Sequence, residues 1–283
     1  MIFDRNEKKE VIALLGAGSM GRAIVRRIAA GRKILFGDIS EKNPEKVSHD
    51  FQYCGYDVET MIVNALEKDS VEAFAQKAAD LGDVMYFIDT AGASPHQTNP
   101  EHILKLDMVG TGYAVDAFGK VMAKGGAGLI ISSRTGYMYP ISYETEQEIL
   151  TTPTEKLMEL PFIKEVAMQN SGLAYMIAKR INHLQAMRAA AATWKERRAR
   201  INTISPGTIV TPLAYDEFAA AGEGYQQMID ASAAERTGTS DEIAEAGAFL
   251  LGEHAKFITG TDLLIDGGVI AAIRTGKYQL HGG

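Results

Sequence analysis

The sequence is poor in cysteine, in basic charge and in long apolar runs, and each shortage excludes a class of protein. One cysteine, Cys54, stands among 283 residues, so no internal disulfide can form, and no Cys/His cluster has metal-ligand spacing. No apolar stretch reaches the roughly 18–20 residues of a membrane helix. The first ten residues lack the apolar core of a signal peptide. A net charge of -7 without a basic run argues against nucleic acid or anionic membranes as partners. We therefore expect a cytoplasmic protein with no metal.

Short apolar runs alternate with helical patterns along the chain. The runs that predict strands cover 11–16, 33–38, 60–65, 84–92, 128–133, 200–207 and 262–268. Helical patterns lie between most of them, at 69–81, 103–124 and 173–193 and after a capping box at 239–242. This alternation predicts an α/β fold, a doubly wound parallel sheet of about seven strands with helices on both faces. No composition shift marks a linker, so we expect a single Rossmann domain over 1–283. Two stretches, 40–57 and the insert over 134–174, read as polar and irregular.

The first strand runs into the glycine-rich sequence Gly16-Ala17-Gly18-Ser19-Met20-Gly21, which a helical pattern follows. In that context G-x-G-x-x-G is typical of a dinucleotide site, because glycines admit a pyrophosphate and the helix N-terminus attracts it. Asp38 closes the second strand, 22 positions after Gly16. A carboxylate there can accept both ribose hydroxyls of adenosine and would repel a 2′-phosphate. The pattern therefore favours NAD over NADP.

Tyr175 and Lys179 lie four apart in a segment without proline or glycine between Leu173 and Thr193. On a helix they share one face. A nearby ammonium stabilises a phenolate and lowers the tyrosine pKa, so the pair can do acid–base chemistry near neutral pH. Ser133 ends the fifth strand, at the edge of the sheet where ligands of open α/β folds gather. It is a candidate hydrogen-bond donor to a substrate oxygen.

Taken as a set, these motifs resemble the short-chain dehydrogenase/reductase family of the Tyr-x-x-x-Lys type, over about residues 11–268. Besides those already described, the resemblance includes Asn64-Ala65, Asp89-Thr90-Ala91-Gly92, Pro206-Gly207 and Asp266-Gly267-Gly268. It implies that Tyr175 exchanges the proton with substrate, that Lys179 tunes Tyr175 and binds the nicotinamide ribose, and that Ser133 polarises the substrate oxygen. The residues that it implies for NAD binding are Gly16, Gly18, Ser19, Met20, Gly21, Asp38, Ile39, Asn64, Ala65, Ala91, Gly92, Tyr175, Lys179, Pro206, Gly207, Ile209 and Thr211.

The sequence departs from the family pattern at several points. Its glycine loop is one residue shorter, with Ser19 where a middle glycine would fall. Asp107 stands where the family has a fourth catalytic residue, an asparagine; it could hold the same water through an oxygen or its backbone carbonyl, or disturb the proton relay. Ser132 rivals Ser133, although the family pattern favours the second serine. An insert over 134–174 and an alanine-rich flap over 212–236 are the expected substrate-binding lid.

The resemblance implies an NAD-dependent oxidoreductase for a secondary alcohol or its ketone. Tyr, Met, Phe and Ala in the insert and flap suit a bulky apolar substrate such as a hydroxysteroid or bile acid, and equally suit core packing. Enoyl-thioester reductases within the family place their lysine seven positions after the tyrosine, where this chain has Asn182. A non-catalytic dinucleotide-binding regulator is the alternative from another class. The family also commonly pairs its long helices, so Ala189–Ala192 suggests a homodimer or homotetramer.

Overall fold

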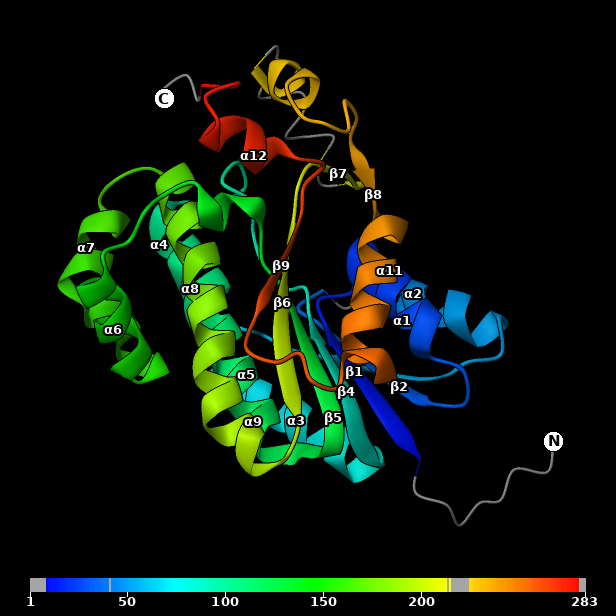
Figure 1. The fold of residues 1–283 in the computed structure, drawn as a ribbon. Coiled ribbons are helices and arrows are strands. Elements are labelled where there is room, and N and C mark those ends of the chain that lie inside the picture. Colours follow the sequence, from blue (N-terminus) through cyan, green and yellow to red (C-terminus); the bar gives the residue numbers. More distant parts are fainter. Residues whose placement is uncertain (1–8, 41, 213, 215–223, 280–283) are drawn as a thin grey trace.

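A single parallel sheet forms the centre of the molecule (Figure 1). The structure is a computed structural model that describes residues 9–40, 42–212, 214 and 224–279. The seven strands lie in the order β3-β2-β1-β4-β5-β6-β9, and all neighbours are parallel. Their bounds are β1 Glu10–Leu15, β2 Lys33–Asp38, β3 Asp57–Ile62, β4 Asp83–Asp89, β5 Met122–Ile131, β6 Arg200–Pro206 and β9 Asp262–Ile265. The predicted doubly wound fold is confirmed.

Helices cover both faces because the strands are apolar on both sides. On one face lie α1 (Ser19–Ile28), α2 (Lys42–Tyr53) and α11 (Ser240–Leu251), around Ile24, Phe51 and Ile243. On the other lie α3 (Lys68–Leu81), α5 (Thr111–Val121) and α8 (Ser171–Ala191). The order of strands reverses direction between β1 and β4. Open sheets of this kind bind ligands at that point, beyond the carboxyl ends of the strands.

The remaining short elements join these layers. Between β4 and α5 lie α4 (Pro100–Ile103) and a π-helical segment, η1 (Leu104–Gly110), and α9 (Thr193–Glu196) follows α8. The short strand β7 (Ile209–Val210) pairs with β8 (Gly238–Thr239). Nearer the C-terminus are η4 (Glu253–Ala255) and α12 (Val269–Arg274). The capping box predicted at the start of α11 is present, since Thr239 and Glu242 each bond the other's backbone. Within the described ranges, no helix is long and apolar enough to cross a membrane.

Two stretches that we expected to be irregular are helical. The segment 40–57 contains α2, which the sequence hides because Val47 and Phe51 are its buried apolar side chains in an otherwise polar run. The insert contains η2 (Arg134–Tyr137), α6 (Tyr143–Thr151), η3 (Thr154–Glu159) and α7 (Pro161–Ala167). Smaller shifts affect the third strand, which begins at Asp57, and the fifth, which begins at Met122.

The insert packs against α8 and builds a third core. Ile149, Leu157 and Ile163 are buried there with Ile177 and Ile181 of α8. Figure 1 shows α6 and α7 on the side of α8 that faces away from the sheet. This part of the chain therefore covers a helix face that a seven-stranded fold without the insert would leave exposed. Of the predicted flap over 212–236, residues 213 and 215–223 lie outside the described residues.

Candidate active site

Three adjoining hollows follow the carboxyl ends of the strands. The first brings Ser133, Tyr175 and Met20 together with four more predicted cofactor residues, Pro206, Gly207, Ile209 and Thr211. The second contains Gly16, Gly18, Asp38, Ile39, Asn64, Ala65, Ala91 and Gly92. A third lies beside both and shares Met20 and Thr211 with the first and Gly18 with the second; Ser19 also lines it. Of the predicted site residues, Gly21, Lys179 and Asp107 line none of these three hollows.

The glycine turn brings Gly16 close to the backbone that follows β4. Gly16 adopts a φ of 81°, and a Cβ there would lie 2.6 Å from the backbone nitrogen of Ala91. Gly18 precedes α1 with no side-chain cap, and the first turn of α1 carries no acidic residue. The first N–H groups of this helix are therefore suited to an anion. Gly21 has a packing role instead, since a Cβ there would come within 2.7 Å of Leu14.

Asp38 anchors the end of β2 beside this turn. One carboxylate oxygen accepts the N–H of Ala17 and the other accepts that of Ser40, both at 2.9 Å. The exposed side chain of Ile39 and the start of the loop at Asn64 line the same hollow. A glycine cradle, an uncapped helix N-terminus and this acidic group together fit a nicotinamide dinucleotide. The basic residues Arg22 and Lys46 line the neighbouring hollow, and sequence reasoning missed both.

Helix α8 positions Tyr175 and Lys179. It begins after Asn170, whose side chain accepts the N–H of Leu173, and it runs for 21 residues. The Lys179 ammonium lies 5.2 Å from the centre of the Tyr175 ring. The hydroxyl of Ser132 donates to the backbone carbonyl of Lys179 at 2.8 Å. Ser132 is therefore engaged in holding α8, which favours Ser133 as the serine that faces substrate.

Asp107 contacts the lysine directly. It is fully buried in η1, with one carboxylate oxygen 3.2 Å from the Lys179 ammonium and the other accepting the N–H of Ala93 at 2.8 Å. Its backbone carbonyl accepts the Asn182 side-chain amide at 2.7 Å. Gln185 donates in the same way to Met108, so two α8 amides hold the π-helical carbonyls. Asn182, at the lysine position of enoyl-thioester reductases, thus has a structural contact here.

A second buried carboxyl faces the same lysine. Asp89 ends β4, is 2% exposed, and burial raises its pKa to about 7. Burial by itself would lower the pKa of Lys179, but the negative charges of Asp107, Tyr175 and Asp89 outweigh it and the net shift is upward. The ammonium is therefore charged, with Asp107 as its partner. Sequence reasoning noted the aspartate at 89 only as part of a motif and missed this electrostatic role.

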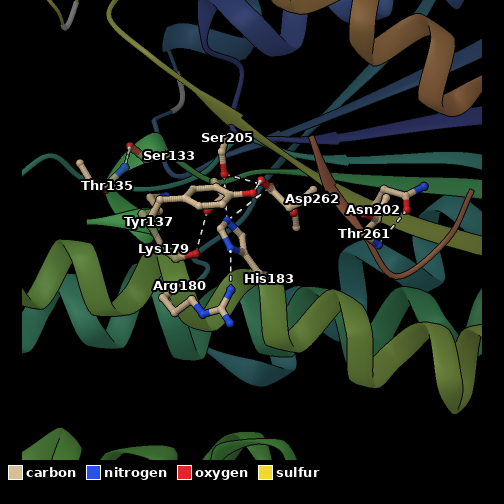
Figure 2. A network of polar contacts seen from close by, with 12 residues as sticks. Ser133, Thr135, Tyr137, Lys179, Arg180, His183, Asn202, Ser205, Thr261 and Asp262 are labelled. Atoms are coloured by element: carbon tan, nitrogen blue, oxygen red, sulfur yellow. Dashed lines mark hydrogen bonds and ion pairs between the residues drawn. The ribbon is translucent and has the colours of Figure 1, made fainter. Parts of the chain in front are cut away.

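A buried polar network ties α8 and the insert to the edge of the sheet (Figure 2). His183, one helical turn after Lys179, lies 2.8 Å from the Ser205 hydroxyl of β6 and 3.4 Å from the Asp262 carboxylate of β9. Tyr137 donates to the same carboxylate at 2.7 Å. Burial lowers the pKa of His183 to about 4, although Asp262 opposes that shift. The imidazole is thus neutral at physiological pH and serves the structure.

Two further residues of the first hollow were missed by sequence reasoning. Arg134 and Thr135 follow Ser133 directly and both line it. The signal that could have found them is a charged residue directly after a candidate catalytic serine. Within the parts of the chain that the structure describes, no group of three or more His, Cys, Asp or Glu side chains could hold a metal ion.

Comparison with known proteins adds an independent line of evidence. The family model described as enoyl-(acyl carrier protein) reductase matches residues 147–270. The short-chain dehydrogenase/reductase bsc3 of Alternaria brassicicola is 36% identical over 93% of this chain and 96% of its own length. The NADP-dependent mannitol dehydrogenase of Hypocrea jecorina is 27% identical over 81% of this chain and 77% of its own. A solved short-chain dehydrogenase/reductase from Serratia marcescens aligns with a TM-score of 0.73 at 21% identity, covering 93% of this chain and 98% of that one.

Proposed function

As this chain belongs to the short-chain dehydrogenase/reductase family, we propose that it is an NAD-dependent oxidoreductase that interconverts a secondary alcohol and its ketone. One observation carries the proposal: Tyr175 and Ser133 line one hollow, the Lys179 ammonium lies 5.2 Å from the Tyr175 ring, and the glycine cradle adjoins that hollow. A regulator that only bound a dinucleotide would have no need of this constellation.

Each residue has a defined part in the reaction. In the oxidative direction Ser133 holds the alcohol oxygen, and Tyr175 accepts its proton. The carbon–hydrogen bond breaks with both electrons, which leaves the ketone. A bound nicotinamide dinucleotide supplies the acceptor for that hydride and the donor for the reverse reaction. Lys179 stabilises the Tyr175 phenolate, and Asp107 keeps the buried lysine charged.

The preference for NAD rests on Asp38. Its carboxylate lies in the hollow that suits the adenosine half and would repel a 2′-phosphate. The mannitol dehydrogenase relative is named NADP-dependent, and Arg22 and Lys46 supply positive charge in the neighbouring hollow. We favour NAD because Asp38, and no described lysine or arginine, lines the hollow that suits the adenosine half.

For the substrate we propose a bulky apolar alcohol or ketone, such as a hydroxysteroid or bile acid. The first hollow has mainly apolar walls, which include Met138, Met176 and Ile209. Within the insert, we propose only its first residues as part of the lid, because Arg134, Thr135 and Met138 line the hollow. The later helices α6 and α7 pack on α8 instead. Ala214 and Tyr225 are the described flap residues that line it.

A homodimer or homotetramer remains part of the proposal, but the insert changes how it could form. Pairing through the outer face of α8 is opposed, because α6 and α7 cover that helix (Figure 1). An assembly would have to use another surface. Light scattering of the purified protein measures the state; a monomer at micromolar concentration would remove this part of the proposal.

The deciding experiment measures initial rates in both directions with NAD(H) and NADP(H) on hydroxysteroids, cyclic ketones and small secondary alcohols. We expect turnover with NAD(H), and a loss of about 10²- to 10⁴-fold in kcat for Tyr175→Phe with dinucleotide binding retained. Dinucleotide binding without turnover of any substrate by the unmodified protein would favour the regulator. Faster turnover of small polar alcohols than of hydroxysteroids would remove the bulky substrate.

A further inference from the structure

Arg134 is a buried cation in the candidate substrate hollow, and no described residue serves as its counter-ion. The residue is 6% exposed and lines the same hollow as Ser133 and Tyr175. Its guanidinium donates to the Thr208 hydroxyl at 2.8 Å and to the sulfur of Met228 at 3.4 Å, and lies 5.7 Å from the centre of the Tyr225 ring. All of these partners are neutral. Its Nε is buried with no hydrogen-bond partner among the residues that the structure describes.

The described surroundings of Arg134 contain no negative charge to balance it. Among the described residues that line the hollow, none is acidic and Arg134 is the sole Lys or Arg. Burying a charge without a partner is costly, so such a group is retained where a ligand supplies the missing charge.

Arg200 shows what a purely structural arginine looks like in this fold. Its guanidinium is half-buried and donates to the backbone carbonyls of four residues, Leu250, Leu251, Gly252 and Ile258. Those carbonyls close the end of α11 against β6. Among the described residues, Arg134 has one hydroxyl and one weak sulfur acceptor for five N–H donors. The contrast indicates that Arg134 keeps donors for a ligand.

A second unpartnered group lies next to it. The hydroxyl of Thr135 is buried, lines the same hollow and has no hydrogen-bond partner among the described residues. Its backbone N–H bonds the Ser133 hydroxyl at 3.2 Å (Figure 2), so the three residues are held as one turn at the end of β5. A guanidinium beside a hydroxyl matches the two oxygens of a carboxylate.

We propose that Arg134, with Thr135, binds a carboxylate of the substrate, so that the protein acts on an amphipathic hydroxy or keto acid. The acid has an apolar body, which the methionine-rich walls contact, and its charge is held apart from the reacting carbon at Ser133 and Tyr175. This assignment rests on the proposed oxidoreductase function and specifies its substrate class. The chemical step is unchanged: the alcohol loses a hydride and a proton, and the carboxylate takes no part in it.

The test compares each acid with its methyl ester on one carbon skeleton, using steroid carboxylic acids and aryl keto acids. In the unmodified protein we expect kcat/KM for the acid to exceed that for the ester by about 10- to 100-fold, as a charge-assisted hydrogen bond supplies. In Arg134→Gln that ratio should fall to near one, through a higher KM for the acid. Arg134→Lys should retain part of the preference. Arg27→Gln, which removes a partly exposed positive charge between α1 and α11, should keep the full ratio.

Several outcomes would overturn the inference. An unmodified protein that turns over ester and acid equally would refute it without any variant, even if Arg134→Gln failed to fold. A phosphate ester of the same skeleton that outperforms the carboxylate by tenfold would replace the carboxylate with a phosphate. A loss of kcat for acid and ester alike in Arg134→Gln would show that Arg134 only supports the flap.

A binding measurement separates this inference from the proposed function. The melting temperature of the protein is followed as the acid or its ester is added, without any need for turnover. If the acid raises the melting temperature, Arg134→Gln abolishes that rise and no substrate is turned over, the anion site is supported and the oxidoreductase proposal is refuted. If substrates are turned over without a preference for the acid, and the acid does not raise the melting temperature, the anion site is refuted and the oxidoreductase proposal is supported.

Discussion

Replacing Asp107 by asparagine should move the pH profile of alcohol oxidation toward lower pH. Asp107 places a negative charge 3.2 Å from the Lys179 ammonium, and at an effective dielectric constant of about 20 that pair interacts by about 5 kcal/mol. The same ammonium lies 5.2 Å from the Tyr175 ring centre, which corresponds to about 3 kcal/mol for a phenolate there. Asp107 therefore cancels part of the field that makes Tyr175 a usable base.

The expected size of the shift follows from that balance. Removing the carboxylate charge makes the surroundings of Tyr175 more positive, which favours the phenolate and lowers the kinetic pKa. Suppose that Asp107 cancels about half of the roughly 3 kcal/mol by which Lys179 stabilises the Tyr175 phenolate. Its removal then shifts the rising limb of kcat/KM for oxidation to lower pH by about one pH unit. Lys179 should stay charged, because Asp89 still faces it. The aspartate position thus distinguishes this chain from the asparagine of its family.

The assay is kcat/KM for oxidation measured from pH 5 to 10, with circular dichroism to show that each variant is folded. Asp89→Asn is the matched control below pH 7: the pKa of Asp89 is about 7, so below that pH the carboxyl is mostly neutral and this part of the profile should hardly change. A further titratable group near Asp107 is His102 of α4. A rising limb that stays in place or moves to higher pH in Asp107→Asn would refute the electrostatic reasoning.

Three further predictions concern the cofactor, the polar network and the core. Asp38→Asn should reduce the ratio of kcat/KM with NAD to that with NADP by about tenfold, because the charge that opposes a 2′-phosphate is gone; an unchanged ratio would disprove that role. The pKa of His183 is about 4 in the folded protein and 6.5 in the unfolded chain, so the unfolded chain gains the proton first as the pH falls. The free energy of unfolding should therefore fall by up to about 3 kcal/mol between pH 6.5 and pH 4. Urea unfolding of His183→Gln should show a flatter pH dependence, and an equally steep one would contradict the low pKa of His183. Gly128→Ala should lower the free energy of unfolding by about 1–3 kcal/mol, because its Cβ would overlap the Trp194 ring; a variant as stable as the parent in urea would show that the ring can move away.

The carboxyl-end motifs were predictable because their function depends on local geometry. Gly16 needs a positive φ, which glycine adopts easily, and Asp38 is placed by the end of a strand with an obvious apolar pattern. Tyr175 and Lys179 share a face through helical periodicity alone. The core strands were equally readable, since parallel strands buried on both faces are continuous apolar runs.

Other features depended on contacts between distant segments. The helix α2 has two buried apolar side chains, too few for its period to stand out. The insert is helical because its scattered apolar residues meet α8, which is remote in sequence from α6. Ser132 and Ser133 could be separated only when the hydroxyl of Ser132 was found on the Lys179 carbonyl, 47 positions away.

By itself, the sequence determined the doubly wound fold, the dinucleotide cradle and the identity of the Tyr175–Lys179 pair, because each is encoded by spacing within one or two elements. Only the tertiary structure decided the electrostatics of the site. It brought the charges of Asp107 and Asp89 to bear on one buried lysine, and it placed Arg134 in a hollow whose described lining holds no carboxylate. Charges act through space, and the distances between them arise only when strands and helices from separate parts of the chain pack together.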